Sequence, residues 1–86
     1  MRIKVIQGSN KGVILQMGGR DRLAVGRSPH NDLTLEDWHI SAEHGCIVRR
    51  GERYILRDFR STNGTSLRRG SHTVVLGEAN NFEEVI

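Results

Sequence analysis

Short apolar runs separated by turn residues dominate the sequence. The expected strands cover residues 4–7, 13–17, 23–27, 33–35, 44–50, 53–58, 65–68 and 72–76, and residues 82–86 form a further strand or an ordered tail. Gly51 supplies the positive φ that a tight hairpin between two of these runs needs. No window combines a sustained 3.6-residue apolar period with helix caps. Many short strands at close spacing therefore predict an all-β sandwich or barrel.

Length and composition fit one small folded domain over residues 1–86. The chain is 36% hydrophobic and 27% charged, which is ordinary for a globular fold and argues against disorder. The net charge of +3 favours an anionic partner without choosing among phosphopeptides, nucleic acid and acidic membranes. The single cysteine, Cys46, lies in an apolar run, so we expect a buried thiol and a reducing, cytoplasmic location. No secretory signal or membrane-spanning run is recognisable.

Most of the unusual polar residues fall in three segments between the expected strands, at 26–32, 41–44 and 58–65. Loops between strands gather at the ends of a sandwich, where a rigid scaffold can hold them together. We therefore expect the chemistry of the domain to lie where these loops meet.

Three short motifs occur in order along these loops: Gly26-Arg27, then Ser41-x-x-His44, then Ser61-Thr62-Asn63-Gly64-Thr65. Through them the chain, over roughly residues 3–76, resembles the forkhead-associated (FHA) family of phosphothreonine-binding domains. The resemblance implies an antiparallel β-sandwich of two twisted sheets. It also implies a protein–protein interaction module, neither an enzyme nor cofactor-dependent, that binds the phosphothreonine of a partner protein marked by a Ser/Thr kinase.

The same resemblance assigns roles to individual residues. Phosphate binding falls to Arg27, Ser41 and Thr62; peptide binding to Asn63 and His39; structural support to Gly26, His44 and Gly64. The chemistry suits these assignments, because phosphothreonine carries about −1.5 to −2 charges and three strong acceptor oxygens. A guanidinium meets such oxygens with two parallel N–H donors and stays charged. The resemblance also implies a preference for phosphothreonine over phosphoserine, because the γ-methyl group packs into a small apolar niche. The sequence does not show this niche.

Other interpretations of these residues are weaker. Ser41 and His44 resemble a nucleophile and base, but no third orienting group accompanies them. The four histidines have no common zinc-ligand spacing, so we expect no metal. The arginines of the second half are expected to form a solvated face. Trp38 and Phe59 are expected to cover core or loop contacts rather than to stack on bases, and no nucleic-acid or membrane partner is expected.

The sequence departs from the family pattern in two places. Ala42 follows Ser41 where many members carry a polar or basic residue that adds a phosphate contact. The family usually closes with a strand pair around a Gly-Asp turn, and the sequence to Ile86 contains no such turn. Either Leu76-Gly77 imitates the closing strand or the last strands are lacking, which would leave a sheet edge for self-association. The alternative function is therefore a phosphate-independent scaffold or oligomerisation domain.

Overall fold

The structure, a computed structural model, describes residues 2–86 and is almost entirely β. Its elements in chain order are β1 (Arg2–Lys4), β2 (Ile14–Gln16), β3 (Arg22–Gly26), β4 (Leu33–Thr34), β5 (Gly45–Arg50), β6 (Arg53–Asp58), β7 (Thr65–Arg69), β8 (His72–Leu76), the 3-10 helix η1 (Glu78–Asn80) and β9 (Glu83–Val85). The predicted strands are thus present, with boundaries shifted by a few residues. Residues 82–86, predicted as a strand or a tail, contain β9.

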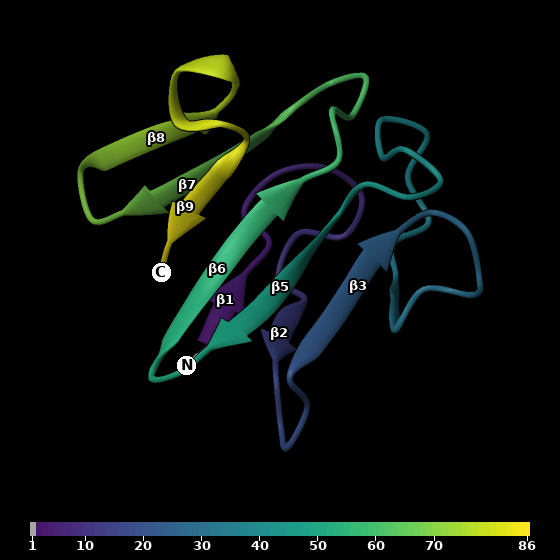
Figure 1. Cartoon of the computed structure of the whole chain (residues 1–86). Helices are drawn as coiled ribbons and strands as arrows, with labels where there is room; N and C mark the ends of the chain where they lie inside the picture. Colours follow the sequence, from purple (N-terminus) through teal and green to yellow (C-terminus); the bar gives the residue numbers. More distant parts are fainter. Residues whose placement is uncertain (1) are drawn as a thin grey trace.

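The strands form one five-stranded sheet and two hairpins. The large sheet has the order β4-β3-β5-β6-β9, while β1 pairs with β2 and β7 pairs with β8. Figure 1 labels all of these strands except the short β4. All pairs are antiparallel except the two-residue pairing of β3 with β4, which is parallel. This exception arises because the chain leaves β3, makes a short loop and returns alongside it in the same direction.

The β5–β6 hairpin turns at Gly51, as the sequence predicted. Gly51 has φ +64°, a conformation that suits glycine because it has no Cβ. The hairpin turn lies at the end of the sheet opposite the loops that follow β3 and β6 (Figure 1). The two ends of the large sheet are therefore distinct, one closed by a tight turn and the other built from longer loops.

The core lies between the large sheet and the β1–β2 hairpin. In the sheet, Leu23 stands opposite Ile47, and Ile47 opposite Leu56, so the three side chains share one face. Ile47 is fully buried, and it clusters with Leu15 of β2 and with Leu23. Two layers joined by an apolar interior are what the predicted β-sandwich requires.

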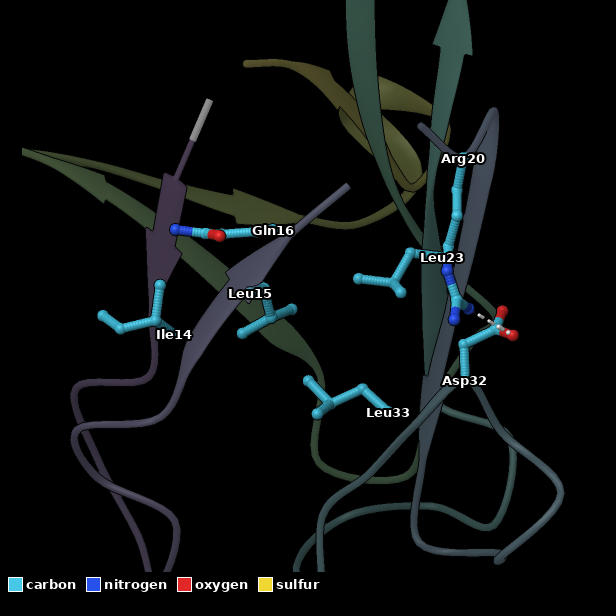
Figure 2. Close-up of a pocket in the computed structure, with 7 residues that line it drawn as sticks. All are labelled: Ile14, Leu15, Gln16, Arg20, Leu23, Asp32 and Leu33. Atoms are coloured by element: carbon cyan, nitrogen blue, oxygen red, sulfur yellow. Dashed lines mark ion pairs between the residues drawn. The ribbon is translucent and has the colours of Figure 1, made fainter. Parts of the chain in front are cut away.

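A hollow of about 200 Å³ opens at the side of this core, between β2 and β3. Figure 2 shows Leu15, Leu23 and Leu33 directed into this space, with the Arg20–Asp32 ion pair of 2.8 Å beside it. None of the residues lining the hollow is among the predicted binding residues. The hollow therefore belongs to the packing between layers, and the predicted site lies elsewhere.

The large sheet brings three loops to one end. The strands β3 and β6 finish at the same end at which the antiparallel β5 begins (Figure 1). The β3–β4, β4–β5 and β6–β7 loops, which carry the three sequence motifs, consequently meet there. Within residues 2–86, no helix has the length and apolar character needed to cross a membrane.

Candidate functional site

Gly26 ends β3, Arg27 begins the β3–β4 loop, and both lie directly against the β4–β5 loop. The Arg27 amide donates to the Ser41 carbonyl at 3.0 Å, and the Ser28 amide donates to the Ala42 carbonyl at 3.1 Å. A Cβ on Gly26 would lie 2.3 Å from the Ala42 oxygen, which is far inside van der Waals contact. Glycine at position 26 therefore permits the close approach of the two loops that places the Arg27 backbone beside Ser41.

Ser41 and Thr62 meet although they are 21 residues apart in sequence. The Thr62 backbone N–H donates to the Ser41 hydroxyl oxygen at 3.1 Å. Because this contact uses the hydroxyl as an acceptor, its own hydrogen is left for donation to a ligand. The β4–β5 and β6–β7 loops are thus joined at the two residues that the sequence assigned to phosphate binding.

The His44 side chain connects the same two loops. Its Nδ1 accepts the Ser41 backbone N–H at 3.1 Å, and its Nε2 lies 3.0 Å from both the Gly64 carbonyl and the Thr65 hydroxyl. Nδ1 must be unprotonated to accept, so Nε2 carries the hydrogen. His44 contacts the Ser41 amide rather than its hydroxyl, and this arrangement suits support of the loop rather than activation of a nucleophile.

Asp58, at the end of β6, completes this support and was missed by the sequence interpretation. Its carboxylate accepts the Ser61 hydroxyl at 2.5 Å, the Thr65 hydroxyl at 2.7 Å and the Ser61 amide at 2.9 Å. Burial alone raises the pKa of Asp58, but these hydrogen bonds outweigh burial and hold the pKa below its ordinary value. Its position at a strand end, three residues before Ser61, was the only available signal in the sequence.

Asn63 links the β6–β7 loop to His39. The Asn63 side-chain amide donates to the His39 carbonyl at 2.9 Å. The His39 imidazole itself is largely exposed and lies 3.1 Å from the Asp37 carboxylate. Gly64 follows with φ +80°, the left-handed turn that the sequence predicted for it. Asn63 and His39 are therefore neighbours at the rim of the site, with the Asn63 amide donors partly used in joining the loops.

The guanidinium of Arg27 faces an aromatic ring rather than an acid. It lies 5.2 Å from the centre of the Trp38 indole, within the range of a cation–π contact. Among residues 2–86 it forms no ion pair with a carboxylate, whereas Arg20, Arg50 and Arg57 do. Its charge is therefore available to an incoming anion.

The turn that carries Trp38 is held by Asp37, a second residue that the sequence interpretation missed. The Asp37 carboxylate accepts the His39 amide at 2.9 Å and the Ser9 amide, from the loop after β1, at 3.0 Å. A Cβ on Gly8 would lie 2.6 Å from this carboxylate, and Gly8 has φ +88°. Asp37 therefore ties the β4–β5 loop to the β1–β2 connection.

At acidic pH, the free energy of unfolding of Asp37→Asn is expected to change less with pH than that of wild type. The hydrogen bonds from the His39 and Ser9 amides lower the pKa of Asp37 from 3.8 to about 2. A carboxyl with a lowered pKa contributes full stability above its unfolded pKa and loses that contribution as the pH falls through the folded value. The difference in urea midpoint between wild type and Asp37→Asn should therefore shrink as the pH falls from 3.8 to about 2. A constant difference over that window would contradict the prediction.

The structure brings the predicted site residues together at one end of the sheet. Arg27 comes from the β3–β4 loop, Ser41 from the β4–β5 loop, and Thr62 and Asn63 from the β6–β7 loop. In the part of the chain that is described, no three His, Cys, Asp or Glu side chains gather as a metal site would require. The arrangement is suited to holding a small anion with donors on a rigid frame.

Comparison with known proteins gives several relatives of the chain. "FHA domain-containing protein FhaB" of Mycolicibacterium smegmatis is 31% identical over 75 residues, which cover 87% of this chain and 48% of that protein. "Transcriptional regulatory protein EmbR" of Mycobacterium tuberculosis is 40% identical over 40 residues, covering 46% of this chain and 10% of EmbR. The chain thus spans about a tenth of one relative and about half of the other.

Two solved structures have a similar fold. M. tuberculosis EmbR in complex with a low-affinity phosphopeptide superposes with a TM-score of 0.55 at 29% identity, covering 91% of this chain and 20% of EmbR. A structure from a study of phosphothreonine-dependent FHA domain interactions gives a TM-score of 0.55 at 23% identity, covering 96% and 81% of the two chains. These likenesses confirm the predicted β-sandwich fold.

The FHA domain family model matches residues 23–80, from β3 to η1. The match contains all three sequence motifs and the strands that position them, and it extends over more than half of the chain. The chain therefore belongs to the FHA domain family.

Proposed function

We propose that this domain binds a phosphothreonine peptide of a partner protein through the loops at one end of its sandwich. The observation that carries the proposal is the meeting of Arg27, Ser41 and Thr62 from three separate loops, joined by the hydrogen bonds from Arg27 to Ser41 and from Thr62 to Ser41. The EmbR structure to which the chain is similar contains a phosphopeptide. Family membership and local geometry thus support the same class of ligand.

In this proposal each residue contributes one kind of contact. Arg27 gives a fixed positive charge and two parallel N–H donors for the phosphate oxygens. Ser41 donates its hydroxyl hydrogen, which the Thr62 amide leaves free. Thr62 adds its own hydroxyl, and Asn63 and His39 contact the peptide beside the phosphate. No covalent step is involved, so the domain acts by binding alone.

A matched pair of peptides tests the proposal. We expect a phosphothreonine peptide selected from a library to bind with a dissociation constant on the order of micromolar, about −8 kcal/mol. Its unphosphorylated twin should bind at least about 30-fold more weakly, because it lacks the charge-assisted hydrogen bonds. Isothermal titration calorimetry of both peptides measures the contrast. Equal affinity for the two would reject the proposal.

A second candidate function is self-association without a phosphate ligand. Several apolar side chains are exposed, and among those on strands Val75 of β8 has the largest exposed fraction, 67%. Exposed apolar residues on a strand favour contact with another chain. Light scattering over a concentration series distinguishes this candidate, which a strictly monomeric protein that binds phosphopeptide would exclude.

A further inference from the structure

Trp38 is held in a position that leaves its large apolar ring in water. Its side chain is 88% exposed, whereas its neighbour Asp37 is 9% exposed. The turn around it is fixed, because the Ile40 amide donates to the Asp37 carbonyl at 2.9 Å and the Asp37 carboxylate accepts the His39 amide. Of the two contacts expected for Trp38, core or loop, the structure shows the loop contact, since its exposed ring faces Arg27 of the β3–β4 loop.

A hollow lies directly beside this ring. Arg27, Glu36, Asp37 and Trp38 line it, and it has a volume of about 200 Å³. Its walls are mainly carbon surface even though three of the four residues are charged. An apolar side chain entering the hollow would contact the indole and this carbon surface. The space is also adjacent to Arg27, the residue proposed to hold the phosphate.

We propose that Trp38 is a specificity-determining residue that contacts an apolar side chain of the peptide one to three residues from the phosphothreonine. This inference rests on the proposed function. The indole centre is 5.2 Å from the Arg27 guanidinium carbon. An extended peptide advances about 3.3–3.6 Å per residue, so a side chain within three residues of the phosphate reaches the ring. Trp38 thereby discriminates among phosphopeptides that Arg27 holds equally well.

The physical gain comes from the surface of the indole. A tryptophan side chain offers about 150–250 Å² for burial, more than most other side chains. Such aromatic anchors dominate binding where they become covered, and their effect depends on the partner side chain. A role confined to ordering Arg27 through the cation–π contact would instead change the affinity for every phosphopeptide by the same factor. This difference separates the two roles experimentally.

A double-mutant cycle tests the inference. A set of phosphothreonine peptides carries Leu or Ala at each of the three positions on either side of the phosphothreonine, and each peptide is titrated against wild type and Trp38→Ala. We expect one position at which Leu binds wild type about 10-fold more tightly than Ala, with the preference lost in Trp38→Ala and largely restored in Trp38→Phe. Capped phosphothreonine alone should bind both proteins similarly. Val75→Ala is the matched control for trimming an exposed apolar residue.

Intrinsic fluorescence provides an independent readout, because Trp38 is the only tryptophan in the sequence. The preferred Leu peptide should shift its emission to shorter wavelength, and the Ala peptide should not. If phosphorylated and unphosphorylated peptides bind wild type equally, both the proposed function and this inference fail. If phosphate dependence holds but no position prefers Leu over Ala, or Trp38→Ala changes the affinity for all peptides equally or for none, only the inference is overturned.

Discussion

Arg27→Ala is expected to weaken phosphopeptide binding by about 30-fold to 1,000-fold, the range for loss of one partner of a hydrogen-bonded charge pair. Stability should change little, because the Arg27 side chain faces the exposed Trp38 ring rather than the core. Titration calorimetry measures the affinity, and thermal unfolding verifies the fold. Arg27→Ala should therefore lower the affinity for phosphopeptide while leaving the midpoint of thermal unfolding nearly unchanged.

Two further variants define the cause of that loss. Arg27→Lys keeps the charge but loses the planar pair of donors, so its affinity should fall between wild type and Arg27→Ala. Arg53→Ala removes the same charge at the start of β6, next to the Gly51 turn at the opposite end of the sheet. Arg53→Ala should bind nearly as wild type does. An equal loss in Arg53→Ala and Arg27→Ala would point to net charge rather than to a defined site.

Gly45→Ala is expected to destabilise the domain by about 3 kcal/mol, at the upper end for overpacking. A Cβ at position 45 would lie 2.2 Å from the Arg57 carbonyl oxygen on the adjacent strand β6. The contact is with backbone, so no side-chain rotation relieves it and the two central strands must separate. For a domain of this size the midpoint of thermal unfolding should fall by roughly 12–24 °C.

Gly19→Ala is the matched control for this substitution. A Cβ at Gly19 meets nothing within 4 Å, and its φ lies outside the positive range that disfavours other residues. Its stability should stay within about 0.5 kcal/mol of wild type. Circular dichroism during heating measures all three proteins. A Gly45→Ala protein that melts with the Gly19→Ala control would show that β5 and β6 adjust more easily than their geometry indicates.

Much of the fold was predictable because the strands follow local rules. Alternating and apolar runs located β5 and β6, and Gly51 located the turn between them. The buried Cys46, 2% exposed, also agrees with its place in an apolar run. The parallel pairing of β3 with β4 was not predictable, since it depends on how the intervening loop returns rather than on the residues that pair.

The candidate site was predictable as a set of motifs but not as a network. The loop residues Arg27, Ser41 and Thr62 stand out by their order in the sequence, and the structure places them together. Asp58 and Asp37 do not stand out, because each also accepts a hydrogen bond from a residue farther away along the chain, Thr65 for Asp58 and Ser9 for Asp37. A carboxylate at a strand end or in a loop looks like an ordinary surface acid until its donors are known.

The mutual bonding of the loops has a consequence for how fast and how selectively a ligand is captured. The contacts of Ser41 with Thr62 and of Asn63 with His39 join the loops through hydrogen bonds of the chain itself. A receptor already assembled spends little conformational entropy on association, so a few polar contacts suffice for useful affinity. Association of the peptide should then occur in one kinetic phase, without a slow rearrangement of the loops. The lifetime of the complex should be set by the dissociation rate of the peptide.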